Sequence, residues 1–131
     1  MGMYTQFHFA SEFKKDTSEE VIETLRYMAD RSLEKPEELP LHPFFECSRW
    51  DMLFAMDSYY FDYKTHCDFS FDDIGDAWYL SVTSNLKNYS NEIELFVDWI
   101  TPYLEKYDGD FLGYSRYEET EEPEIIYYKD K

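Results

Sequence analysis

The chain has 131 residues, a formal net charge of −17 and an aromatic content of 21%. So many aromatic residues argue against an acidic disordered tail, and the excess of acids argues against a protein that neutralises nucleic-acid phosphates. No apolar run approaches the roughly 18 residues of a membrane span, and only 4 glycines leave no glycine-rich phosphate loop. We expect one folded domain at residues 3–131, leaving aside Met1 and Gly2 as an added leader.

The N-terminal third predicts a strand followed by a helix. Residues 3–9 alternate between apolar and polar side chains, as in a strand with one face in the core. Thr17 at the N-cap and Glu20 three residues later fit a capping box, so a helix should begin there. The apolar residues that follow recur at helical spacing, and the helix should end near residues 32–33, ahead of Pro36.

The next segments are less regular. Residues 34–43 contain three prolines and three glutamates, which predicts a linker or extended loop. Residues 44–63 are dense in aromatic side chains. Within them, residues 49–56 fit either one or two helical turns or a strand, and the composition of residues 59–63 favours a strand.

Two further strands are expected next to each other. Residues 68–72 and 78–83 both alternate, and Asp73-Ile74-Gly75-Asp76 between them forms a turn signal. The two segments should therefore pair as antiparallel strands.

Ser90 is expected to cap a second helix. Its buried stripe would consist of Ile93, Phe96, Val97, Ile100 and Leu104. Pro102 predicts a kink or a fresh helical start, and Asp108-Gly109 a stop. Residues 111–118 and 124–129 then read as strands joined by an acidic turn at residues 119–123.

The resulting order is β, α, an uncertain aromatic segment, β, β, α, β, β. Two helices that each follow strands favour an α+β, two-layer sandwich with both helices on one face of a mainly antiparallel sheet. We expect a ferredoxin-like arrangement or a variant of it.

No recognisable metal or catalytic motif accompanies this fold. His66-Cys67-Asp68 is the tightest group of ligand types, but neighbouring residues of a strand rarely bind one ion together. Cys47 lies among aromatics, as a buried inert thiol would. Without a signal peptide we expect reduced cysteines and a cytoplasmic protein, with no metal and no cofactor. A non-enzymatic function is favoured, and an enzymatic one stays open.

Several aromatic side chains fall on the outward face of the predicted sheet. This face would be either an exposed platform or a surface buried under residues 44–63. If it is exposed, the negative charge favours a protein partner or self-association over the stacking of nucleic-acid bases. The residues concerned are Tyr4, His8, Tyr79, Tyr114 and Arg116.

The acidic surface has two interpretations, solubility and recognition of a basic protein. Residues 1–66 carry 13 acids and 7 bases, and residues 67–131 carry 16 acids and 5 bases, so the balance is −6 against −11. We expect the partner-binding acids in the second half. They are Glu92, Glu94, Asp98, Glu118, Glu119, Glu121 and Glu122. In composition alone, the chain is similar to small acidic inhibitor or accessory proteins of phages and mobile elements.

An alternative function places a small-molecule or enzymatic site in the aromatic segment. A pocket near Cys47 would be lined by Trp50, Tyr59, Tyr60 and Tyr63.

Overall fold

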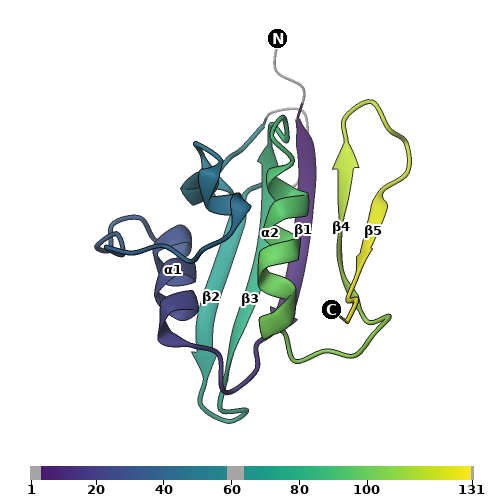
Figure 1. The fold of residues 1–131 in the computed structure, drawn as a ribbon. Coiled ribbons are helices and arrows are strands. Elements are labelled where there is room, and N and C mark those ends of the chain that lie inside the picture. The colour runs from purple at the N-terminus through teal and green to yellow at the C-terminus, as the bar shows by residue number, and fades with distance from the viewer. Residues whose placement is uncertain (1–3, 59–63, 131) are drawn as a thin grey trace.

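The fold is α+β, with one five-stranded antiparallel sheet and two α-helices (Figure 1). The computed structural model describes residues 4–58 and 64–130. The strands are β1 (Thr5–Glu12), β2 (His66–Asp72), β3 (Ala77–Leu86), β4 (Phe111–Tyr117) and β5 (Glu124–Tyr127). The helices are α1 (Glu19–Ala29) and α2 (Glu92–Ile100), with short 3-10 turns η1 (Pro43–Glu46), η2 (Trp50–Met52) and η3 (Thr101–Tyr103). The predicted order of elements is confirmed.

The strand order across the sheet is β2-β3-β1-β4-β5. The central strand β1 pairs with β3 along its whole length, from Thr5 opposite Leu86 to Glu12 opposite Tyr79. On its other side β1 pairs with β4, and the pairing of β4 with β5 is interrupted by a bulge between Phe111 and Gly113. The predicted pairing of β2 with β3 is confirmed.

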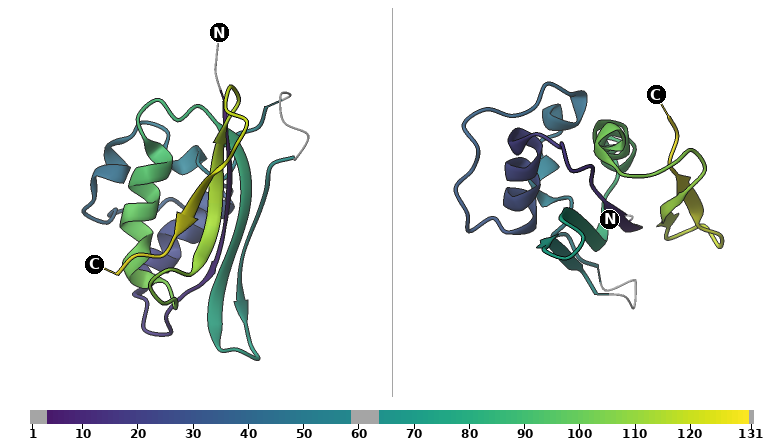
Figure 2. Two further views of the ribbon diagram at one scale, coloured as in Figure 1. Left: turned by 90° about the vertical axis from the view of Figure 1, so that its right-hand side faces the viewer. Right: turned by 90° about the horizontal axis from the view of Figure 1, so that it is seen from below.

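Both α-helices lie on the same side of the sheet (Figure 2). The alternation of β1 turns Phe7 and Phe9 toward this side, where both are buried against Phe96 of α2. From α1, Leu25 and Met28 join the same core. Burial of these apolar faces between sheet and helices is the main force that holds the layers together.

Within the described part of the aromatic segment, residues 44–58, several rings join this core. Phe44 stacks on Trp99 with ring centroids 6.0 Å apart, and Phe54 meets Phe96 edge to face at 5.3 Å. Of the two options for residues 49–56, the structure has a helical turn, η2. The expected strand at residues 59–63 falls outside the described residues.

The start of α1 differs from the predicted capping box. Ser18 occupies the N-cap, and its side chain makes no capping hydrogen bond. The hydroxyl of Thr17 instead donates to the carbonyl oxygen of Lys14 at 2.7 Å, which holds the turn before the helix. The helix ends at Ala29, earlier than residues 32–33. Residues 30–42 that follow contain no helix or strand, and we refer to residues 33–42 as the proline loop.

The prediction that Ser90 caps α2 is also wrong. Asn91 is the N-cap, in a left-handed conformation without a side-chain capping bond. The cap is formed from outside the helix by Asn88, whose Oδ1 accepts from the backbone N–H of Ile93 at 2.9 Å. At the other end α2 stops at Ile100, well before Asp108-Gly109, and Pro102 lies in the fresh turn η3.

Candidate functional site

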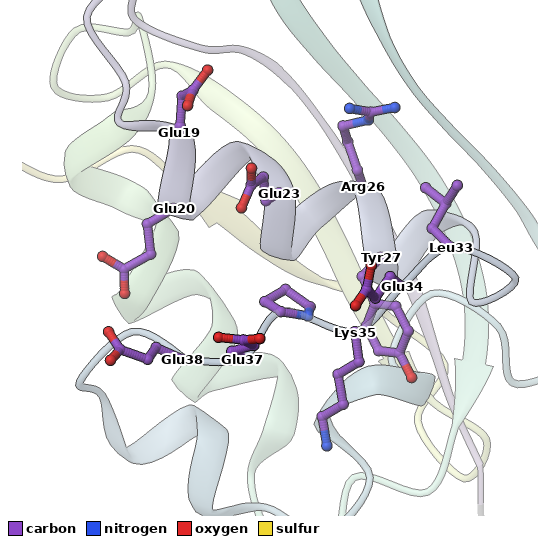
Figure 3. Close-up of a pocket in the computed structure, with 11 residues that line it drawn as sticks. Glu19, Glu20, Glu23, Arg26, Tyr27, Leu33, Glu34, Lys35, Glu37 and Glu38 are labelled. Carbon is purple, nitrogen blue, oxygen red and sulfur yellow. The ribbon is translucent and has the colours of Figure 1, made fainter.

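Several carboxylates line a hollow between α1 and the proline loop. The hollow has a volume of about 710 Å³. Figure 3 shows its lining side chains, of which six are glutamates. We call this hollow the glutamate groove. Its acids are Glu19, Glu20, Glu23, Glu34, Glu37 and Glu38.

The amphipathic pattern of α1 explains one wall of the groove. Val21, Leu25 and Met28 are buried against the core. The acids of the same helix are therefore turned to solvent, because side chains three and four residues apart share a face. The helix ends at Ala29, and the proline loop returns along the exposed side of α1 as the second wall.

The carboxylates of the groove make no ion pairs with other described residues. Within residues 4–58 and 64–130, none of the six forms an ion pair or a side-chain hydrogen bond. Two bases also line the groove, but Lys35 extends its amine over the ring of Trp50, 5.8 Å from the ring centroid. In Figure 3 the carboxylates of Glu20 and Glu38 lie at one end of the hollow, and the charged group of Arg26 points away from them. The groove therefore presents a negative surface to solvent.

The acids expected to bind a partner lie in two settings. Glu92 is only 7% exposed, and its Oε1 accepts from the backbone N–H of Ser90 at 2.7 Å. Glu94 accepts two hydrogen bonds from the amide of Asn88 at 3.0 and 2.9 Å. Asp98 accepts from His42 at 2.8 Å, and Glu118 accepts from the backbone N–H of Tyr4. These four carboxylates already have internal partners.

The other three predicted acids, Glu119, Glu121 and Glu122, are exposed in the turn between β4 and β5. Glu122 and Glu94 together line a second hollow of about 270 Å³, with Tyr117 at its wall. Burial is the main cause that raises the pKa of the Tyr117 phenol, with Glu119 and Glu118 adding to the shift. This hollow contains fewer carboxylates than the glutamate groove.

The predicted aromatic face lies on the side of the sheet away from the helices. His8 stacks on Tyr114 with ring centroids 4.5 Å apart, and burial lowers the pKa of its imidazole. Tyr79 is 39% exposed and donates to Glu12 at 3.1 Å, a bond that raises the pKa of the phenol. Arg116 is half-buried, and Tyr4 lies under the amine of Lys87 at 5.6 Å. Among the described residues, this face therefore combines the His8–Tyr114 stack with the rings of Tyr4 and Tyr79 and with polar side chains.

Of the residues expected to line the alternative aromatic pocket, the structure describes only Trp50. Trp50 is buried in the core, where it contacts Tyr27 and Phe45. Tyr59, Tyr60 and Tyr63 lie outside the described residues.

The described residues offer little support for a reactive thiol or a metal site. Burial raises the pKa of Cys67 to about 12, and burial with the nearby Glu92 and Glu46 raises that of Cys47. Neither thiol is therefore activated as a nucleophile. Across residues 4–58 and 64–130, no three His, Cys, Asp or Glu side chains are arranged to hold a metal ion. In the same residues, no helix is both long and apolar enough to cross a bilayer.

Comparison with protein-family models, with curated proteins and with solved structures found no match for the chain. The inference about function therefore depends on the site geometry alone.

Sequence reasoning missed the glutamate groove, although its acids are visible in the sequence. The larger excess of acids in residues 67–131 favoured a partner-binding surface in the second half of the chain. The overlooked signal is the repeat of Glu19, Glu20 and Glu23 on the outward face of a helix. A segment with three prolines and three more glutamates follows directly, and in the structure it returns along α1.

Proposed function

We propose that this protein is a small, non-enzymatic binding protein that engages a basic protein partner through its acidic surface. The observation that carries the proposal is the glutamate groove, where six carboxylates line one hollow without an ion pair among the described residues. Unpaired carboxylates on a folded scaffold attract a basic surface over a distance of about a Debye length, ~10 Å at 0.1 M salt. A basic partner would supply the counter-charges that the groove lacks.

The groove, rather than the turn between β4 and β5, is our first choice for the contact surface. Four of the seven acids expected in the second half of the chain already accept hydrogen bonds inside the protein. The three exposed acids of the turn, Glu119, Glu121 and Glu122, remain as a secondary candidate.

The same charge disfavours direct binding to nucleic acid, because −17 repels phosphates. An inhibitor or accessory protein that occupies a partner's phosphate-binding surface is the form of the function that fits this charge. The partner and the protein would meet in a reducing compartment such as the cytoplasm, a view that the free Cys47 and Cys67 support.

For the fold we propose a ferredoxin-like arrangement with β5 as an added edge strand. Two features support it: β3 lies between β1 and β2, and β1 lies between β3 and β4. Each α-helix thus connects strands that are separated by one intervening strand, as in a split βαβ unit.

The test is an affinity capture from host lysate with three forms of the protein. One is wild type, the second carries Glu23→Gln, Glu37→Gln and Glu38→Gln, and the third carries Glu119→Gln, Glu121→Gln and Glu122→Gln. The last two lose the same number of charges, so they separate a local site from general repulsion.

We expect a basic protein to be retained at low salt by wild type and by the turn variant, and to be lost by the groove variant. Moderate salt should elute it. Loss from the turn variant alone would transfer the site to the acids of the turn. Retention that neither salt nor either variant changes would rule out electrostatic recognition.

A further inference from the structure

Another hollow, distinct from the one beside Tyr117, adjoins the glutamate groove. Its lining indicates which kind of side chain the proposed basic partner would insert there. It has a volume of about 800 Å³ and lies between the N-terminal part of α1, the C-terminal part of α2 and the end of the proline loop. Glu20 and Glu38 line both hollows, so the two are continuous at these residues. We call the hollow between the two helices the α1–α2 hollow.

The lining of the α1–α2 hollow combines apolar and polar side chains. Its apolar and aromatic residues are Val21, Leu39, Pro40, Leu41, Trp99, Pro102 and Tyr103. Leu41 is fully exposed at 104%, and Leu39 and Tyr103 are half-buried. Such side chains gain free energy when a partner removes them from water, about 25 cal/mol for each Å² of apolar surface.

The segment around Leu41 is held in place by contacts within the protein. His42, the next residue, accepts from the backbone N–H of Phe44 at 3.1 Å and is bound to Asp98 of α2 at 2.8 Å. Pro40 precedes Leu41 and restricts the backbone further. Because this segment is already ordered, a partner that binds to it loses less conformational entropy.

The charges around the hollow define what it can accept. Its described lining contains Glu20, Glu38 and Asp98 but neither Lys nor Arg. On the other side of Glu20 and Glu38 lie the remaining carboxylates of the glutamate groove. A ligand that spans both hollows has to be apolar at one point and cationic beside it.

We propose that the occupant is an extended segment of the basic partner in which a bulky apolar side chain is flanked by Lys or Arg. The apolar side chain enters the α1–α2 hollow against Leu39, Leu41 and Tyr103, and the flanking cations meet Glu20, Glu38 and the groove. This inference depends on the proposed function, since it names the part of the basic partner that the acidic surface recognises.

The probes for the test are two synthetic peptides with the same flanking lysines, one with a central leucine and one with a central serine. Their binding is measured by fluorescence anisotropy at low salt. Three proteins are compared: wild type, Leu41→Ser, and Ile74→Ser. Ile74 is the matched control, because it is 97% exposed in the turn between β2 and β3, away from both hollows.

We expect wild type to bind the leucine peptide about tenfold more tightly than the serine peptide. Leu41→Ser should reduce that ratio about threefold or more and leave the serine peptide unaffected, whereas Ile74→Ser should change neither. Both substitutions are at fully exposed side chains, so the fold is retained.

Two results would overturn the inference, and they are distinguishable from each other. In the first, wild type binds both peptides equally well and loses both in the variant with Glu23→Gln, Glu37→Gln and Glu38→Gln. This result would contradict the apolar contact but support binding through the acidic surface. Absence of binding by either peptide at low salt would remove the proposed function together with the inference.

Discussion

The imidazole of His42 joins the proline loop to α2 through a hydrogen bond to Asp98, with Nε2 2.8 Å from Oδ2. The other ring nitrogen, Nδ1, accepts from the backbone N–H of Phe44 at 3.1 Å. A nitrogen that accepts carries no proton, so Nε2 carries it and donates to the carboxylate. One side chain thus caps η1 and ties together segments 56 residues apart in sequence.

His42→Ala should destabilise the protein by about 1–2 kcal/mol, because it removes both the cap and the bond to α2. Asp98→Asn should cost less, since an amide oxygen still accepts from Nε2 and the cap is kept. Urea unfolding of both variants measures the difference. If Asp98→Asn lowers the free energy of unfolding by more than His42→Ala does, the two contacts of His42 do not account for the effect, and the explanation is wrong.

Gly113 of β4 is required by the close approach of β1. A Cβ atom built there would lie 1.9 Å from the carbonyl oxygen of His8, which belongs to the backbone and has no rotamer to change. Gly113→Ala should therefore cost at least about 3 kcal/mol, since the two strands have to move apart.

Gly109 is the control for this substitution. It has nothing within 4 Å of its Cβ position but adopts a φ of +93°, so Gly109→Ala carries only the conformational cost, about 1 kcal/mol. The midpoint of urea unfolding should fall much further for Gly113→Ala. Similar midpoints for the two variants would contradict the steric explanation.

The described strands and their succession along the chain could be predicted because the information is local. The alternation around Phe7 and Phe9 or along β3 is visible within a few residues, and it fixes which face is buried. The helix caps could not be predicted to the residue. Thr17 and Ser18 are chemically similar candidates, and the choice depends on the carbonyl oxygen of Lys14, whose position is set by the folded chain.

The candidate site was missed for a related reason. Counts of acids along the sequence treat the chain as a line, whereas the groove depends on the return of the proline loop along α1. The count also includes carboxylates that are used internally, such as that of Glu92, which accepts from the backbone N–H of Ser90 in the turn before α2. Sequence alone predicted the sign of the surface charge but not its location.

The thiol of Cys67 should be unreactive in the folded protein. With its pKa raised by burial to about 12, only about one thiol in ten thousand is ionised at pH 8. In a Cys47→Ser variant, reaction with Ellman's reagent at this pH should therefore be at least about a hundredfold slower than for free cysteine.

Raising the pH should accelerate the reaction of Cys67 until the pH reaches the folded-state pKa, and unfolding in denaturant should bring the rate to that of free cysteine. The reciprocal variant, Cys67→Ser, reports on Cys47 under the same conditions. Rapid reaction of Cys67 in the native protein would show that the side chain is neither buried nor protonated as described.

The glutamate groove should also destabilise the folded chain, because like charges are held near one another without counter-ions from the protein. The variant with Glu23→Gln, Glu37→Gln and Glu38→Gln is therefore expected to be more stable than wild type at low salt, by about 0.5–1 kcal/mol. Near 1 M salt, where the Debye length is about 3 Å, the difference should shrink.

Thermal unfolding at the two salt concentrations measures this effect, with the Glu119→Gln, Glu121→Gln and Glu122→Gln variant as the charge-matched control. A gain confined to the groove variant would mean that its carboxylates are retained at a cost to stability, as expected for residues kept for binding. If instead the groove variant is less stable than wild type at low salt, these carboxylates stabilise the fold and the groove is a structural feature, not a binding surface.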